Sequence, residues 1–353
     1  MNNLSFLKSI VRHRYVTAIP TFVLGPLTFH GSIGDEEVCI PFATTEAVLP
    51  ESIQRGIRAV NLSGGCNACL VADAMTRCPV FEAKSVRQAL DVRRKIQKNI
   101  HVLQNIARET SGHLELTSST CWVVGRFIYI RFAFDTGDAM GMNMVTIATE
   151  KLCAWVTERT EARVISLSSN MCSDKKAAGV NFLLGRGKTV IAEASILESV
   201  LQDVLHTSAR AIVKVVIAKH FVGSGLALAQ GFMNSHVANV LAGVFLATGQ
   251  DLAQLVESSM GIVLAEEEER GSLYLSATIP CLEIGTVGGG TSLPYAKRSL
   301  ELMGCLDRDS KTGESAKRFA EIIAGTCLAG ELSLLACLAE GTLAEVHLKH
   351  RER

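Results

Sequence analysis

The sequence predicts an α+β fold, in which a large helix-rich domain surrounds a buried central helix and a small α+β domain is inserted into it. Three observations support this prediction. Residues 84–108 carry apolar side chains at helical spacing within a strongly charged stretch. Two strand-like runs rich in aromatic and branched residues follow at 115–124 and 127–134. Residues 236–248 are apolar on all sides, as expected of a helix in the interior of a domain.

The composition limits the class of protein. The chain has 353 residues, enough for about two domains at about 150 residues each. Lysine and arginine together number 35, as do aspartate and glutamate, so no net charge attracts nucleic acid or a lipid surface. The 11 cysteines have no repeating spacing, and we identify neither a leader nor an apolar run long enough to span a bilayer. We therefore expect a cytoplasmic protein with small-molecule partners, not with nucleic acid or a membrane.

The inserted domain is predicted from a run of consecutive elements. The helix at 84–108 is followed by the two strands, then by a helix at 138–158 and a strand at 162–167. This stretch is more highly charged than its surroundings and forms a compact α+β unit. We place the inserted domain at 80–166 and the large domain at 1–79 and 167–353.

The large domain is predicted from four further patterns. Residues 189–192 resemble a strand, and 196–205 an amphipathic helix. Residues 212–218 are rich in β-branched side chains and are predicted to be β-structure. The buried helix at 236–248 is the central one.

A short segment after the strand at 127–134 is the strongest candidate for a ligand site. Its sequence at 138–144 is DAMGMNM, and Asp138 is predicted to be the N-cap of the following helix. Ala139 and Gly141 are small enough to let a ligand approach the backbone, and the first amides of a helix attract anions. A capped helix after a strand is also ordinary architecture, so this pattern alone leaves cofactor binding open.

Three polar loops interrupt apolar segments. Lys175 and Lys176 follow Asp174 and could polarise a carbonyl or hold a carboxylate, although this pattern alone favours a solvated charged turn. Asp251 ends the sequence GQD after the apolar helix and could be an N-cap. Glu46 follows small residues and could be a general acid or a first-turn helix residue.

Other motifs are interpreted as structural. The glycine-rich run GTVGGGT at 285–291 permits close approach of a ligand or a second subunit, but also fits a simple turn. The sequence GRGKT at 185–189 lacks the leading glycine of a phosphate loop, which excludes a nucleoside triphosphatase. Cys66 and Cys69 have zinc-ligand spacing without a second pair, so no metal is expected. His347 lies in a basic tail, where a solvent-facing histidine is the ordinary expectation.

Taken together, these segments resemble the 3-hydroxy-3-methylglutaryl-CoA reductase family over nearly the whole chain from about residue 19. The matching motifs are PTFVLGPL at 20–27, FATTE at 42–46, DAMTRCP at 73–79, DAMGMNM at 138–144, SDKK at 173–176, GQD at 249–251 and GTVGGGT at 285–291. The SDKK and GQD loops are similar to those of class I, which includes animal and archaeal enzymes. Without a membrane leader, the chain resembles the soluble archaeal-type members most.

The resemblance implies a fold, a reaction and an assembly. The inserted domain would be ferredoxin-like and would bind the nicotinamide cofactor. The reaction would reduce a thioester in two steps to mevalonate and free CoA, with NADPH as the expected cofactor and NADH possible. Relatives complete their sites across a subunit interface, which implies a homodimer or a higher homo-oligomer.

The resemblance also assigns roles to individual residues. Lys175 would stabilise the oxyanion, Glu46 would supply a proton, Asp251 would link the two, and His347 would protonate the departing thiolate. The cofactor would contact Asp138, Ala139, Met140, Gly141, Met142, Asn143 and Met144. The hydroxymethylglutaryl group would be held by Arg77, Ser168, Asp174, Lys176 and Lys219, with Asn239 supporting the catalytic lysine. Ser52, Gln54, Arg55 and Arg58 would lie along the CoA nucleotide.

An alternative function follows from departures from the family pattern. Phe22, Ala47, Pro50 and Ala177 stand where the family has other residues. A catalytically silent CoA-binding or regulatory homologue is the alternative that these departures motivate. No arginine of the kind that some relatives use for a 2′-phosphate is found at Ser111, Gly112 or His113.

Overall fold

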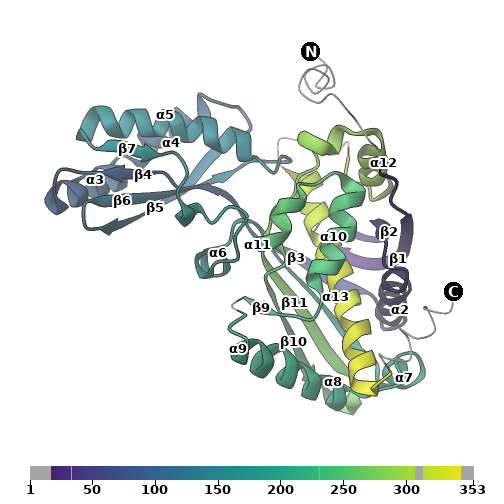
Figure 1. Cartoon of the computed structure of the whole chain (residues 1–353). Coiled ribbons are helices and arrows are strands. Elements are labelled where there is room, and N and C mark those ends of the chain that lie inside the picture. Colours follow the sequence, from purple (N-terminus) through teal and green to yellow (C-terminus); the bar gives the residue numbers. More distant parts are fainter. Residues whose placement is uncertain (1–16, 33, 230, 307–312, 343–353) are drawn as a thin grey trace.

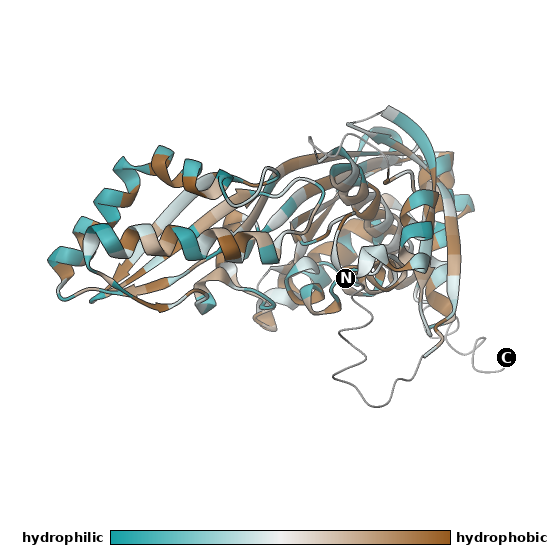
Figure 2. Ribbon diagram, turned by 90° about the horizontal axis from the view of Figure 1, so that it is seen from above, coloured by the Kyte–Doolittle hydropathy of each residue, from teal (hydrophilic) through white to brown (hydrophobic). Residues whose placement is uncertain are grey.

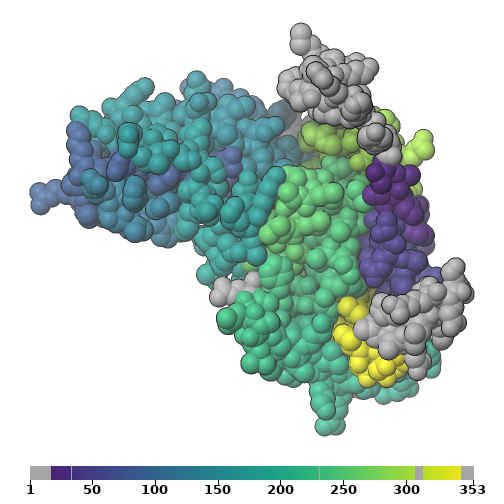
Figure 3. Space-filling view, in the orientation of Figure 1, coloured from purple at the N-terminus to yellow at the C-terminus, as the bar shows by residue number. Residues whose placement is uncertain are grey.

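The computed structural model describes residues 17–32, 34–229, 231–306 and 313–342. It is a mixed α/β fold with two lobes of unequal size, which lie side by side in the space-filling view (Figure 3). The strands form one 11-stranded sheet in the order β7-β4-β6-β3-β8-β11-β10-β9, with β1 beside β2 and β3, and β5 beside β6. The sheet therefore runs through both lobes (Figure 1).

The larger lobe contains most of the strands and helices, including one long helix, α13, that the sequence does not predict as a single element. Its strands are β1 (Thr21–Gly31), β2 (Gly34–Ala43), β3 (Cys66–Arg77), β8 (Gly187–Ile196), β9 (Phe232–Met233), β10 (Gly261–Glu267) and β11 (Leu273–Leu282). Its helices are α2 (Val48–Leu62), α6 (Gly179–Leu184), α7 (Glu198–Asp203), α8 (Ala209–Val216), α9 (Ser224–Leu226), α10 (Val237–Thr248), α11 (Leu255–Ser258), α12 (Pro294–Leu302) and α13 (Glu314–Glu340). Short 3₁₀ turns η1 (Asn170–Cys172), η3 (Leu252–Gln254), η4 (Glu269–Gly271) and η5 (Gly289–Ser292), and a π-helical turn η2 (Ile217–Gly223), lie between them.

Helix α13 is the centre of this lobe. It contacts α2, α8 and α10 and the strands β3, β8 and β11 (Figure 1). The crossing with α2 is close because Gly56 faces the Ala329 carbonyl, where a Cβ atom would lie only 1.8 Å from the oxygen. By length and composition α13 could cross a membrane, but 83% of its most apolar window is buried within the protein. It is therefore a core helix of this fold, and it joins the predicted helix α10 at the centre.

Buried charges on α13 all have partners. Arg318 pairs with Glu36 at 2.5 Å. Glu321 accepts hydrogen bonds from the amides of Ser32 and Leu70, at 3.3 and 3.2 Å. Because these partners compensate the loss of hydration, an apolar core can contain charged side chains.

The smaller lobe is built from β4 (Val80–Glu82), α3 (Val86–Lys98), α4 (Ile100–Arg108), β5 (Glu115–Val124), β6 (Phe127–Asp135), α5 (Met142–Thr160) and β7 (Arg163–Ser166). The predicted helix at 84–108 is two helices, because the chain breaks at Asn99, which is the C-cap of α3. Hydrophilic and hydrophobic residues alternate around these helices (Figure 2). Their apolar faces join a hydrophobic core of buried residues between 75 and 162, which is separate from the core of the larger lobe.

Strand β3 joins the two lobes. Its first part pairs with β8, and its last residues, Met75 to Arg77, pair with β6 of the smaller lobe. Residues 138–144, which are predicted to bind the cofactor and are called the cofactor segment below, follow β6, and a β-bridge joins Ala139 to Val287 of the larger lobe.

One predicted strand is a helix. Residues 212–218 lie in α8 and the π-helical turn η2, not in β-structure. Ser208 caps α8 by accepting a hydrogen bond from the Ala211 amide, and the buried residues Ala209, Ile212 and Val216 recur at helical spacing against β10. Burial at helical spacing overrode the β propensity of the branched residues.

Candidate active site

A cavity of about 550 Å³ lies between the two lobes. Three sequence motifs that are far apart along the chain line it. The first is the cofactor segment, from Ala139 to Met144; the second is Gly249, Gln250 and Asp251; the third is the glycine-rich run at 285–291, of which all but Thr286 contribute. Their convergence makes this cavity the candidate active site.

The cofactor segment is fixed to the larger lobe by backbone contacts. The Asp138 carbonyl accepts hydrogen bonds from the amides of Thr286 and Val287, at 2.8 and 3.3 Å. Gly285 approaches the segment so closely that a Cβ atom would lie 2.4 Å from the Met140 nitrogen. The glycine-rich run is therefore needed for close packing of the two lobes.

Asp138 has a different role from the one predicted. Helix α5 begins at Met142 and is preceded by Gly141, which has φ 91° and offers no side-chain cap. The Asp138 carboxylate instead accepts a hydrogen bond from the Ala316 amide in the first turn of α13, at 2.8 Å. Burial raises the pKa of Asp138 above its ordinary value, and this hydrogen bond opposes the shift. The first amides of α5 remain without a side-chain cap, beside the cavity.

Lys175 and Asp251 form an ion pair beside the cavity. The Lys175 Nζ atom lies 2.9 Å from Asp251 Oδ2, and both side chains are partly exposed. The other carboxylate oxygen, Oδ1, accepts a hydrogen bond from the Ala253 amide, so Asp251 is also the N-cap of the next turn. The hydrogen bond to Asp251 raises the pKa of Lys175, against the effect of partial burial, and the charges of Asp251, Asp174 and Glu257 raise it further.

The other two predicted catalytic residues are not part of this pair. Glu46 has an exposed side chain, and among the residues that the structure describes its carboxylate has no hydrogen bond or ion pair to Lys175 or Asp251. His347 lies outside the described residues. Of the three predicted catalytic side chains within the described residues, one chain thus brings Lys175 and Asp251 together.

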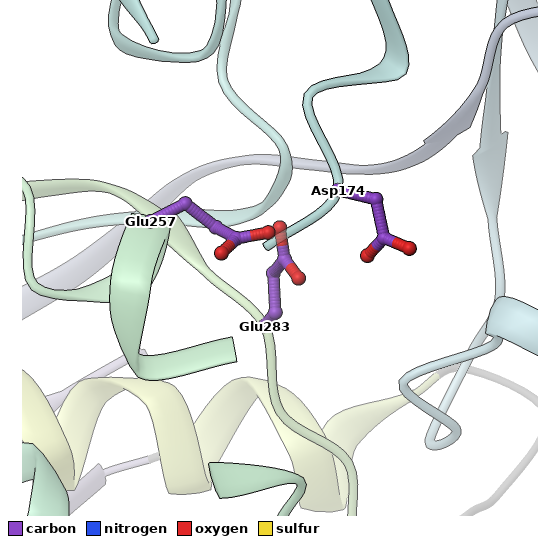
Figure 4. A group of neighbouring side chains, drawn as sticks. All are labelled: Asp174, Glu257 and Glu283. Carbon is purple, nitrogen blue, oxygen red and sulfur yellow. The ribbon is translucent and has the colours of Figure 1, made fainter. Parts of the chain in front are cut away.

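The loop that carries Lys175 is anchored by a buried network of charges. The Arg186 guanidinium is fully buried and is bonded to Asp174 at 3.1 Å, to Glu257 at 2.8 Å and to Glu283. Carboxylate oxygens of the three acids lie within 4.8 Å of one another, and Glu257 and Glu283 point toward each other (Figure 4). Arg77 lies 3.6 Å from Asp174 and adds a second guanidinium. We call Arg186, Asp174, Glu257 and Glu283 the buried ion network.

The sequence did not identify this network, although it contains two signals. Glu283 lies between apolar residues in the run PCLEIG, where an unpaired carboxylate would be costly. Arg186 lies in the sequence GRGKT, which resembles the end of a phosphate loop. Neither signal indicates which residue is the partner, because Glu257 and Glu283 are 71 and 97 positions from Arg186 along the chain.

The remaining predicted residues lie in several places. Ser168 is exposed and is bonded to Cys172, with 3.1 Å between Oγ and Sγ, while Lys176 donates to the Asp174 carbonyl. Lys219 and Asn239 are exposed, and in the described part of the chain no hydrogen bond joins either side chain to Lys175. The structure therefore brings Arg77, Asp174 and Lys176 to Lys175, but not Lys219 or Asn239.

The predicted CoA residues line a second cavity of about 450 Å³ beside Gly25 and Pro26. Gln54, Arg55 and Arg58 contribute to it, whereas Ser52 bonds Ser333 on α13. Arg55 also donates to the Ser333 carbonyl, at 2.6 Å, which leaves Arg58 as the exposed cation at this cavity.

Cys66 and Cys69 do not share a site. Both lie on β3, where Cys66 is buried and Cys69 is exposed. Residues three apart on a strand point to opposite faces, so zinc-ligand spacing in the sequence does not bring these thiols together.

Comparisons with known proteins agree on one family. The family model described as hydroxymethylglutaryl-coenzyme A reductase matches residues 16–352. The chain is 46% identical over 334 residues to the 3-hydroxy-3-methylglutaryl-coenzyme A reductase of Pyrococcus horikoshii, covering 94% of this chain and 81% of the relative. For that of Methanothermobacter thermautotrophicus the identity is 43%, covering 94% and 82%. A class II reductase structure from Streptococcus pneumoniae bound to NADPH is similar in fold, with a TM-score of 0.74 at 19% identity, covering 95% of this chain and 89% of that one.

Proposed function

Because this chain belongs to the hydroxymethylglutaryl-coenzyme A reductase family, we propose that the cavity between its lobes is where the family's reaction takes place. The reaction is the reduction of (S)-3-hydroxy-3-methylglutaryl-CoA to mevalonate and free CoA, a step of the mevalonate pathway of isoprenoid biosynthesis. Two reduced nicotinamides and two protons are consumed. The observation that carries the assignment is the convergence of three motifs on one cavity, with the Lys175 to Asp251 ion pair beside it.

The residues around the cavity fit a nicotinamide dinucleotide. The first amides of α5 have no side-chain cap and lie beside the cavity, where they can hold a pyrophosphate. Gly288 and Gly289 line the cavity, and a Cβ atom at either would meet nothing within 4 Å, so a ligand can approach the backbone there. Each reduced nicotinamide that binds there would supply one hydride, so two molecules are needed in succession, and we propose that residues 138–144 hold each of them, with Asp138 acting through the backbone.

The catalytic roles follow from charge. The Lys175 ammonium, kept protonated by Asp251, stabilises the oxyanion that develops as the thioester carbonyl is reduced. Glu46 supplies a proton to the alcohol oxygen, and His347 protonates the departing CoA thiolate, which prevents its return to the aldehyde. Arg77, Ser168, Asp174, Lys176, Lys219 and Asn239 bind the hydroxymethylglutaryl group, and Ser52, Gln54, Arg55 and Arg58 bind CoA.

We propose that the active unit is a homodimer or a higher homo-oligomer. One chain does not bring Glu46, Lys219 or Asn239 to Lys175. Exposed apolar side chains lie close to Lys219 along the chain, and a second copy would cover them. These are Ile217, Phe221, Val222, Leu226 and Leu228, which are 39 to 83% exposed.

We assign the chain to the soluble, cytoplasmic, archaeal-type members of class I. The archaeal relatives are 43 and 46% identical, whereas the class II structure is 19% identical. The boundaries of the inserted domain at 80–166 are supported by the separate hydrophobic core of the smaller lobe. Its element order β-α-β-β-α-β, with α3 and α4 in place of one helix, supports the ferredoxin-like arrangement.

A direct assay tests the proposed function. Purified protein should oxidise NADPH in the presence of the thioester and release one mevalonate and one CoA thiol for every two NADPH. Absorbance at the nicotinamide band and a thiol reagent measure the two quantities. CoA binding without any oxidation of NADPH or NADH would instead establish the silent homologue that Phe22, Ala47 and Pro50 suggest.

The preference for NADPH is assigned to Arg108. This arginine lines a cavity of about 270 Å³ together with Ser111, Gly112 and His113, next to Gly137 and the cofactor segment. Its exposed ion pair with Glu115, at 2.7 Å, is of a kind that contributes little and can be exchanged for a phosphate. Arg108→Ala should raise the KM for NADPH about tenfold and change that for NADH less than about twofold.

The control for this prediction is Arg94→Ala, which removes another exposed arginine of the smaller lobe, paired with Asp91. Steady-state kinetics with both cofactors should be unchanged in this variant. An equal rise of both KM values in Arg108→Ala would show that Arg108 does not contact the 2′-phosphate.

A further inference from the structure

Lys175 has a backbone conformation that requires external support. Its φ is 58°, and that of Ser173 is 55°, both in the left-handed region. In this region a side chain costs roughly 1 kcal/mol or more per residue, because Cβ approaches the carbonyl oxygen. Contacts from outside the loop must therefore hold Lys175 in place.

Glu257 supplies the most direct of these contacts. Its Oε1 atom accepts a hydrogen bond from the Lys175 amide at 2.6 Å. Glu257 lies on α11, is completely buried, and is 82 residues away along the chain. The bond holds the backbone of the residue whose ammonium reaches Asp251, so it fixes the point from which that side chain extends.

Arg186 bonds both Glu257 and Asp174, the residue that precedes Lys175. The same Oε1 atom of Glu257 accepts from the Arg186 guanidinium at 2.8 Å, and Asp174, the neighbour of Lys175, accepts from the other guanidinium nitrogen at 3.1 Å. Gln254 also donates to Asp174, at 3.2 Å. Two successive residues of the loop are thus fixed to one buried guanidinium, one through its side chain and the other through its backbone.

The same guanidinium reaches the cofactor segment. Arg186 Nη2 lies 3.0 Å from the sulfur of Met142, the first residue of α5. The network therefore connects the Lys175 loop to residues that line the cavity.

We propose that Glu257, held by Arg186, is a positioning residue that fixes the Lys175 ammonium for reduction of the carbonyl. The inference rests on the proposed function, in which Lys175 stabilises the oxyanion. Displacement of a catalytic group by about 1 Å can cost about 100-fold in rate. Loss of the Glu257 acceptor should therefore lower kcat while the CoA site, on other elements, keeps its affinity.

Two substitutions separate the hydrogen bond from the charge. Glu257→Gln retains an oxygen that can accept from the Lys175 amide, and its new NH₂ group can donate to the neighbouring Glu283 carboxylate. Glu257→Ala removes the acceptor. We expect kcat to fall about 100-fold in Glu257→Ala and to stay within about threefold of the unaltered protein in Glu257→Gln, with KM for the thioester changed less than about threefold in both.

A matched control removes another buried glutamate. Glu321 is also fully buried and also accepts backbone hydrogen bonds, from Ser32 and Leu70, but not from the Lys175 loop. Glu321→Ala should lower the melting temperature and leave kcat unchanged at a temperature where the protein is folded. If Glu257→Ala does not fold, Glu257→Asp keeps the charge beside Arg186 but withdraws the oxygen from the Lys175 amide, and should show the same loss of kcat.

Several results would overturn the inference. One is unchanged kcat in folded Glu257→Ala or Glu257→Asp. Another is an equal loss in Glu257→Gln and Glu257→Ala, which would mean that the charge matters and the hydrogen bond does not. A loss matched by Glu321→Ala would indicate stability alone. An inactive unaltered protein would refute the proposed function itself, which separates the two failures.

Discussion

Replacement of Lys175 with alanine should lower kcat by about 100- to 1000-fold while the affinity for free CoA stays unchanged. The ammonium is the charge that stabilises the oxyanion in the proposed mechanism, and removal of one such donor costs about this much in other enzymes. The charge matters mostly in the transition state, so the loss should affect turnover more than ground-state binding. Gln54 and Arg58, which are proposed to bind CoA, line a separate cavity and are unaltered by this substitution.

Steady-state kinetics and calorimetric titration of CoA measure the two quantities. Lys297→Ala is a suitable control, because this exposed lysine pairs only loosely with Glu301, at 3.9 Å, and lies outside the site. It should behave like the unaltered protein. A large loss of substrate affinity with unchanged kcat in Lys175→Ala would show that Lys175 binds the substrate and does not stabilise the oxyanion.

The secondary structure of the smaller lobe could be predicted from local patterns because each element has a strong one. The apolar spacing from Val86 to Ile106 predicted helix, and the runs at 115–124 and 127–134 predicted strands that the structure contains as β5 and β6. The break at Asn99 could not be predicted, because it depends on how α3 and α4 pack against α5. Local periodicity indicates a helical segment, but not whether that segment is broken into two helices.

The larger lobe was predicted less well because its elements are buried on several sides. Helix α13 has small and apolar residues all round, so it shows no amphipathic periodicity from which its length could be inferred. The run at 212–218 was assigned to β-structure from its branched residues, and packing against β10 decided otherwise. In such segments tertiary contacts, not local preference, determine the structure.

In the candidate site, too, local motifs could be predicted from the sequence, whereas contacts between distant residues could not. Each motif that lines the cavity is a continuous stretch of residues, so it could be identified from the sequence. The buried ion network could not, because Arg186 meets Glu257 and Glu283 only after β8, α11 and the end of β11 have packed together. A sequence shows which residues can carry charge, whereas the fold decides which charges meet.

Replacement of Arg186 with methionine should destabilise the protein by about 3–5 kcal/mol, because it leaves buried carboxylates without their common partner. Burial raises the pKa of Glu257 above its ordinary value and that of Glu283 well above it, and Arg186 opposes both shifts. Below their ordinary pKa of 4.5 these acids are protonated in both the folded and the unfolded state, so burial of their side chains costs no free energy of ionisation there. Their contribution to stability is lost as the pH rises through the folded-state values.

Without Arg186 these folded-state pKa values rise further, so the loss of stability should be larger at pH 8 than at pH 5. Denaturant unfolding at the two pH values measures it. Arg318→Met is the matched control: Arg318 is equally buried, but its partner Glu36 is 40% exposed and can be hydrated, so the loss should be smaller and less dependent on pH. An equal loss for Arg186→Met at both pH values would mean that the guanidinium contributes through packing, since protonation of the acids would then bring no relief.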